Sequence, residues 1–311
     1  MVDGRDGGVP GHPPARLPTP YDGSSKLFQI GLKPLEIAAW IDVDHRLPAY
    51  LDEKARVHAA HPGEVFAAEP GTEAAQAEVL HLLATHLAAR FPAIYRRAGG
   101  RVEIVPAGRR VDLDDPARPP LAIAAALVQE DLAIMRRGET GWRLAAASLS
   151  FPSSWALREK FGRPMHEIHG PVPGFGAATR NAQLIERMFD HLRPEMPVIR
   201  WNWSLYGDDR LFHPESTDPA GRRFGAGERA GTVFLRVERQ TLRKLPASGD
   251  ILFTIRIYID PLEALDKAPE APRIAAALIA QLEALDAAQL DYKGLTQERD
   301  RLIRRLAELA T

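Results

Sequence analysis

The chain has 311 residues, enough for one large domain or two small ones, and its 45% hydrophobic and 26% charged residues are typical of a globular protein. Its 40 basic residues nearly balance its 41 acidic ones, which argues against nucleic acid or a membrane surface as a partner. The chain has no cysteine and therefore no cysteine-ligated iron–sulfur cluster, so electrons for any redox reaction would have to come from another protein. No segment is typical of a spanning helix or a secretory signal, and we expect a cytoplasmic protein.

The first 25 residues are rich in glycine and proline and show no hydrophobic period. This composition predicts a disordered leader over 1–25. We expect the remaining residues, 26–311, to form a single domain.

The first half of this domain contains one predicted helix and two predicted strands. Residues 72–91 place apolar side chains on one stripe, between a candidate N-cap at Thr72 and a stop at Pro92. Residues 101–105 and 142–150 have the composition of strands.

The second half contains a larger share of the strand signals. Predicted strands lie at 200–206, 231–239 and 251–259, and the connection at 240–250 is short enough for the last two to pair antiparallel. Predicted helices lie at 179–192, 273–289 and 294–309. Because strands and helices do not alternate strictly, the order predicts an α+β fold, an antiparallel sheet with helices packed around it.

His166 and His169 lie in a segment crowded with proline, glycine and tryptophan. On a helical turn this spacing would put both imidazoles on one side, where a metal ion could be shared. Gly170 and the flanking prolines limit any helix to a single turn, and the sequence identifies no third ligand. The residues by themselves leave a metal pair, a single functional histidine and a hydrogen-bonded loop histidine as alternatives, and favour the last.

Arg256 lies in the middle of a predicted strand, on the same side as Thr254 and Tyr258. An arginine buried there must be paired, because an unpaired charge in a core is costly. The favoured interpretation is an ion pair with Glu238 across the sheet. The alternative is a clamp on a carboxylate or phosphate group of a ligand.

The glycine pairs Gly174/Gly176 and Gly225/Gly227 lack the third glycine and the strand–helix context of a dinucleotide fingerprint. The sequence contains neither a Walker A motif nor a G-x-S-x-G motif. We therefore predict no nicotinamide or flavin site on this chain.

Seven blocks of sequence are long enough to be compared with known families. They are GLKPL at 31–35, AQAEVL at 75–80, QEDLAIMR at 129–136, SFPSSWALREKFGRPMHEIHGPVPGF at 150–175, RWNWSL at 200–205, RVERQTLRKLPASGDILFTIRIYIDPL at 236–262 and YKGLTQERDRL at 292–302. From about residue 27 to its end, the chain resembles the haem-dependent oxidative N-demethylase alpha subunits and their relatives.

This resemblance implies that 26–311 form a PAS-like antiparallel sheet that holds a haem b, with C-terminal helices. It implies an oxygenase component, an amine monooxygenase, that uses O₂ to oxidise a small secondary amine such as dimethylamine to a primary amine and formaldehyde. Electrons would come from NADPH through partner reductase subunits that carry flavin and an iron–sulfur cluster. The lack of cysteine and of nucleotide motifs here agrees with that division of labour.

The resemblance also implies site residues. His169 matches the family's recurrent histidine in I-H-x-P-V-P and is the predicted axial ligand of the haem iron. Its neutral imidazole would coordinate through one nitrogen while the other donates a hydrogen bond to a carbonyl or carboxylate. The other predicted residues are Arg200, Arg239 and Arg256, which would hold the haem propionates, and Trp155, Glu238 and Tyr258, which would line the catalytic pocket.

Two other functions are compatible with the same fold. A PAS-like haem or gas sensor would signal through the C-terminal helices, although no output domain is predicted after the sheet. A relative that has lost haem would act as a binding module.

Overall fold

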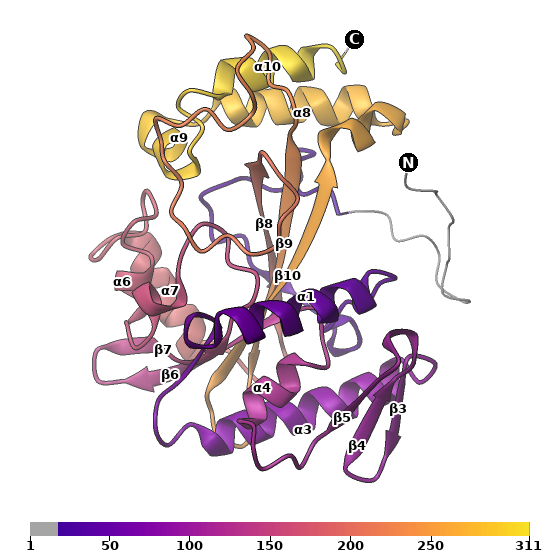
Figure 1. Cartoon of the computed structure of the whole chain (residues 1–311). Helices are drawn as coiled ribbons and strands as arrows, with labels where there is room; N and C mark the ends of the chain where they lie inside the picture. The colour runs from indigo at the N-terminus through magenta and orange to yellow at the C-terminus, as the bar shows by residue number, and fades with distance from the viewer. Residues whose placement is uncertain (1–17, 311) are drawn as a thin grey trace.

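A seven-stranded antiparallel sheet runs through the centre of the protein (Figure 1). The computed structural model describes residues 18–310, except the side chain of Lys267. In spatial order the strands are β1 (Lys33–Pro34), β8 (Val198–Tyr206), β9 (Phe234–Lys244), β10 (Ile251–Pro261), β6 (Asp131–Gly138), β7 (Gly141–Ser148) and β2 (Phe66–Ala68). A second sheet consists of β3 (Tyr95–Ala98), β4 (Arg101–Ile104) and β5 (Arg109–Asp112).

Helices lie at both ends of the long strands β8–β10 and beside β6 and β7 (Figure 1). At one end are α8 (Ala271–Glu283), α9 (Ala287–Lys293) and α10 (Arg299–Ala307). At the other end are α3 (Glu73–Arg90), α4 (Pro120–Ala125) and the small sheet, while α1 (Leu47–Ala60) crosses the middle. The short helices α2 (Pro62–Val65), α5 (Leu157–Lys160) and α6 (Met165–Ile168), the longer α7 (Arg180–His191) and the 3₁₀ turns η1 (Ile37–Ala39), η2 (Val105–Ala107) and η3 (Leu262–Lys267) complete the order.

Strand register divides the side chains of β8–β10 between two faces of the sheet. Glu238 is paired with Asn202 on one side and with Ile257 on the other, and directly paired residues point to the same face. We call this face the His169 face, because the segment around His169 packs on it. The next residue, Arg239, is paired with Arg256 and points to the opposite side, the Arg256 face.

Different hydrophobic clusters cover the two faces. On the His169 face, Ile255, Ile257 and Ile259 pack with the 150–175 segment and with α7. Two separate hydrophobic clusters cover the two ends of the Arg256 face. Its end near Leu252 packs under α3 and α4, and its end near Trp203 packs under α8 and α10.

The structure confirms the α+β class and the antiparallel sheet, whereas PAS-like topology stays a prediction. The predicted helix at 273–289 is two helices, α8 and α9, because Asp286 begins a new capping box with Gln289. Strand β6 was not predicted, because its residues are nearly all buried and show no alternation. Thr72 occupies the N-cap of α3, but its hydroxyl donates to the Glu69 carbonyl and does not cap the helix.

Of the predicted leader, residues 1–17 lie outside the described residues. Residues 18–25 are part of the folded domain, which corrects the predicted boundary: Tyr21 is buried against Trp203, and its carbonyl accepts a hydrogen bond from Gln281 of α8. None of the helices within 18–310 is long and apolar enough to cross a membrane.

Candidate functional site

Residues 151–155, the FPSSW loop, are fixed to the sheet by two buried charged groups. The Asp131 carboxylate accepts the backbone N–H groups of Ser150 and Phe151 at 2.7 and 2.8 Å. The Arg236 guanidinium, which is completely buried, donates to the Phe151 carbonyl at 2.8 Å and to Ser153 Oγ at 2.9 Å. These bonds satisfy polar groups of Ser150, Phe151 and Ser153 and hold the loop against the His169 face.

One residue of this loop has a strained backbone conformation. Within residues 18–310, three non-glycine residues have positive φ: Phe28 at 55°, Ser154 at 63° and Ala178 at 66°. Ser154 belongs to the FPSSW loop, and the Phe28 ring lies 5.9 Å from the ring of Tyr292 in α9. Strained conformations of this kind persist where the surrounding structure enforces them, often at functional sites.

Glu238 is a buried, ionised carboxylate at the centre of the His169 face. Gln240 Nε2 and Asn202 Nδ2 donate to its Oε2 at 2.6 and 3.4 Å. Burial by itself would raise the pKa of Glu238, but the Ser153 hydroxyl and the Arg236 charge outweigh it, and the pKa is lowered. The side chain is therefore charged at neutral pH.

Two lysines approach this carboxylate from different helices. Lys160 ends α5 and lies 4.1 Å above the Trp155 ring, and Lys293 ends α9. Burial lowers the pKa of each lysine to about 8, although the Glu238 charge opposes that shift. Both amines are therefore mainly charged at pH 7 in a poorly solvated environment.

Arg200 adds a third cation on the same face. One of its terminal nitrogens donates to the Gln29 carbonyl at 3.3 Å, while its buried Nε has no hydrogen-bond partner among residues 18–310. Burial lowers the pKa of Arg200, opposed by Glu238 and Tyr292. The face thus has more buried positive charge than Glu238 alone can balance.

His169 directly follows α6 and is half-buried, with its ring 6.2 Å from the Phe175 ring. Burial, reinforced by the nearby Lys160 and Arg200 charges, lowers the pKa of His169 to about 4. A hydrogen bond of the ring with the Met165 backbone has the opposite effect. At neutral pH the imidazole is therefore uncharged, with one nitrogen engaged and a lone pair on the other.

An open cleft of about 550 Å³ begins next to His169. Its lining joins the segment after His169 to α9: Gly170, Pro171, Val172, Pro173, Gly174, Gly176, Pro219, Ala288, Asp291 and Tyr292. Its volume lies within the range of ligand and cofactor pockets.

A family model described as haem-dependent oxidative N-demethylase, alpha subunit-like, matches residues 31–303. The chain belongs to this family. The N-demethylase-like family is named for haem dependence, so the site can be tested for its fit to haem.

The side chains of the His169 face fit a haem. Haem presents an iron that accepts a neutral imidazole and two propionate carboxylates that need cations. His169 has the free lone pair and a second nitrogen held by backbone, the arrangement usual for metal-ligating histidines. Lys160 and Arg200 supply buried positive charge that no carboxylate within residues 18–310 neutralises by an ion pair.

Three of the predicted site residues lie on the Arg256 face and are bonded there to an N-terminal segment. Arg256 is fully buried and forms a 2.8 Å ion pair with Asp44, so the predicted ion pair with Glu238 is wrong. Arg239 donates to the carbonyls of Ala39 and Trp40, and the Tyr258 hydroxyl donates to Asp42. The sheet separates these side chains from His169.

The structure brings His169, Arg200, Glu238 and Trp155 together on one face. Sequence reasoning missed the residues that complete this group: Ser153, Lys160, Asn202, Arg236, Gln240 and Lys293. The alternation of side chains along a strand could have identified three of them, since residues two positions apart share a face. Asn202 lies two positions from Arg200, and Arg236 and Gln240 each lie two positions from Glu238. Lys293 belongs to the YKGLTQERDRL block, but nothing local connects it with the sheet.

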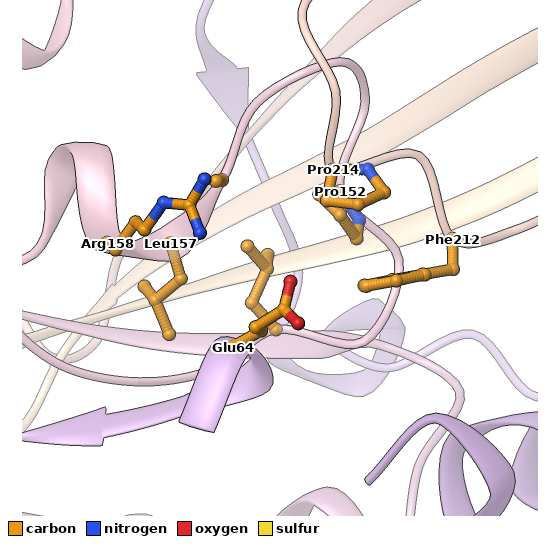
Figure 2. Close-up of a pocket in the computed structure, with 8 residues that line it drawn as sticks. Glu64, Pro152, Leu157, Arg158, Phe212 and Pro214 are labelled. Carbon is orange, nitrogen blue, oxygen red and sulfur yellow. The ribbon is translucent and has the colours of Figure 1, made fainter. Parts of the chain in front are cut away.

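Two other features do not form a binding site. Among residues 18–310, no three histidine or carboxylate side chains are grouped to hold a metal ion, so His166 and His169 acquire no third ligand. A hollow beside the FPSSW loop has a volume of only about 10 Å³, room for about one water molecule. Figure 2 shows how Glu64, Leu157 and Phe212 close around it.

Proposed function

We propose that this protein is the haem-binding oxygenase component of a system that removes a methyl group from a small secondary amine such as dimethylamine. The observation that supports this most strongly is that a neutral His169 and an ionised, buried Glu238 lie on the same face of the sheet, beside an open cleft. An amine-oxidising haem protein needs both groups, one for iron and one for the ammonium form of its substrate.

His169 would hold the iron, and Lys160 and Arg200 would hold the propionates. Bound haem would supply the activation of O₂. Trp155 lies under Lys160 and packs with the apolar cluster of this face, so it would form a wall that excludes water from the reacting amine.

Glu238 would bind and deprotonate the substrate. Small secondary amines are cations at neutral pH, and a buried carboxylate attracts them strongly. A carboxylate has about four acceptor positions. Gln240, Asn202 and Ser153 use three of them, which leaves room for an N–H group of the amine, whose proton Glu238 would accept.

The overall reaction balances with an external electron donor. Dimethylamine, O₂, two electrons and two protons give methylamine, formaldehyde and water: one oxygen atom leaves in formaldehyde after the C–N bond breaks, and the other leaves in water. The chain has no cysteine and no nucleotide motif to supply those electrons. Partner reductase subunits that draw on NADPH would therefore deliver them.

The first test is the ultraviolet–visible spectrum of the protein expressed with added haem, compared with His169→Ala and with His166→Ala as the matched control. We expect a Soret band in the wild type and in His166→Ala, and a weakened or shifted band in His169→Ala. If neither the wild type nor His166→Ala shows a Soret band, the haem proposal is wrong.

The second test is formaldehyde release from dimethylamine with an artificial electron donor. The proposal predicts one formaldehyde for each amine consumed. A protein that binds haem and O₂ but releases no formaldehyde would instead be a sensor.

A further inference from the structure

Lys293, in the YKGL part of the C-terminal block, reaches the edge of the central sheet. Strand β1 pairs with Ile199 and Val198 of β8, and within residues 18–310 no strand covers the rest of that edge. The Lys293 amine donates to the Trp203 carbonyl at 2.7 Å, to Asn202 Oδ1 at 3.3 Å and to Ser204 Oγ at 3.4 Å. One lysine from α9 thus satisfies three acceptors of β8.

The backbone fixes the position of this lysine. Gly294, which follows it, has φ of +63°, and a Cβ atom there would lie 1.9 Å from Cγ2 of Thr217. Only glycine is compatible with both the positive φ and the close contact with Thr217. Arg223 donates a 2.9 Å hydrogen bond to the Lys293 carbonyl. The backbone from which the Lys293 amine extends is therefore held in place.

Asn202 connects Lys293 to the site carboxylate. Its Oδ1 accepts from Lys293, and its Nδ2 donates to Glu238 Oε2 at 3.4 Å. A lysine donates only, so its bond to Oδ1 turns the amide nitrogen toward Glu238. The lysine therefore sets the orientation of a group that contacts the carboxylate.

We propose that Lys293 is a positioning residue for Glu238: through Asn202 it orients the carboxylate for amine binding. The α9 helix thereby completes the site. This inference rests on the role of Glu238 in the proposed function.

The electrostatic surroundings agree with this role. The titratable and charged groups that face Glu238 from the packed elements are Arg236, Lys160, Arg200, Lys293, Tyr206 and Tyr292. The Lys293 charge lowers the pKa of Glu238, so its removal must raise that pKa.

The first experiment compares Lys293→Gln, Lys293→Arg and Lys33→Gln, a control at an exposed lysine of β1, by the pH dependence of kcat/KM for dimethylamine. In Lys293→Gln we expect the acid limb to move up by about one pH unit, with a normal Soret band. Lys293→Arg retains the charge and should restore most of the profile. An acid limb in Lys293→Gln that matches Lys33→Gln would overturn the inference.

The second experiment needs neither haem nor amine. Chemical unfolding of the haem-free chain is measured for Lys293→Gln, Glu238→Gln and the double variant. We expect the effect of the double variant on the unfolding equilibrium constant to differ from the product of the single effects by about fivefold or more. Additive effects would refute the coupling. If the wild type lacks a Soret band and releases no formaldehyde, the proposed function is refuted. The unfolding experiment with the double variant then tests the coupling between Lys293 and Glu238 independently.

Discussion

The two faces of the central sheet each contain a buried arginine, but in different circumstances. Arg256 forms an ion pair with Asp44, and its guanidinium lies 4.3 and 4.6 Å from the rings of Tyr50 and Tyr258. Arg200 has a single carbonyl partner at 3.3 Å and no carboxylate bonded to it within the described residues. The Nε atoms of both arginines have no hydrogen-bond partner among residues 18–310, so the two residues differ in how their charge is balanced.

This difference separates a structural role from a ligand-binding one. On the Arg256 face, the Asp44 carboxylate bonds Arg256 and the Asp42 carboxylate bonds Tyr258. These bonds hold the segment before α1 against the sheet. On the His169 face, Lys160, Arg200 and Lys293 gather around Glu238 and form no ion pair with a carboxylate within residues 18–310, so their charge is available to an anionic group. We infer that the burial of a charged residue does not identify a site, whereas an unbalanced buried charge does.

The largest expected effect is on the Arg256 face. Arg256→Met should lower the free energy of unfolding by about 3–5 kcal/mol, because it leaves the partly buried Asp44 without its partner. Urea unfolding measures this, with exposed Arg96→Met as a control expected to stay within about 0.5 kcal/mol. The haem content of the folded fraction should not change. If Arg256→Met is stable but loses haem, the haem site lies on the Arg256 face, and its assignment to the His169 face is wrong.

Tyr258→Phe should have a smaller effect on the same face. It removes the hydroxyl that donates to Asp42; because Asp42 is exposed and water can replace that donor, the loss should cost about 0.5–1.5 kcal/mol. The same unfolding assay measures the change, and kcat/KM for dimethylamine should equal that of the wild type. A large loss of activity at unchanged stability would give Tyr258 the pocket role that its position on this face does not support.

Arg200→Met should show the reverse pattern. Its stability should stay close to that of the wild type, because no carboxylate loses an ion-pair partner. The dissociation constant for haem should rise by about tenfold or more, the equivalent of one charge-assisted hydrogen bond. Titration of the haem-free protein with haem measures this constant. Unchanged haem affinity would exclude Arg200 as a propionate partner.

The smallest expected effect is the pH dependence contributed by His169. Its pKa falls from 6.5 in the unfolded chain to about 4 in the folded protein. Its contribution to stability is therefore complete above pH 6.5 and is lost as the pH falls toward 4, because the unfolded state binds the proton more readily. Between pH 6.5 and 4.5, the free energy of unfolding of the haem-free wild type should fall more than that of His169→Gln, by the order of 1 kcal/mol. Equal slopes would show that folding does not lower the pKa of His169.

The sequence was a good guide to local structure. Periodicity predicted α3 and α7 to within about a residue at each end, and alternation correctly placed Arg256 on one side with Thr254 and Tyr258. The seven blocks led to the family that the match over 31–303 shows. Each of these inferences needs only neighbouring residues or a contiguous pattern, which a linear sequence contains in full.

The sequence did not determine the register in which the strands pair. Whether Glu238 meets Arg256 depends on the register of β9 against β10, in which Glu238 is opposite Ile257. A shift of one residue exchanges the two faces, so a correct list of strands does not fix which charges meet.

By itself, the sequence determined α3, α7, β8 and β10 closely, together with the absence of thiolate ligands and the block that contains His169. Only the tertiary structure decided that Lys160 and Lys293 converge on Glu238 and that Arg256 is bonded to Asp44, 212 residues away. The physical reason is that a charged side chain takes its role from how its charge and hydrogen bonds are satisfied. Distant segments of the chain supply those partners, and they meet only in the folded protein.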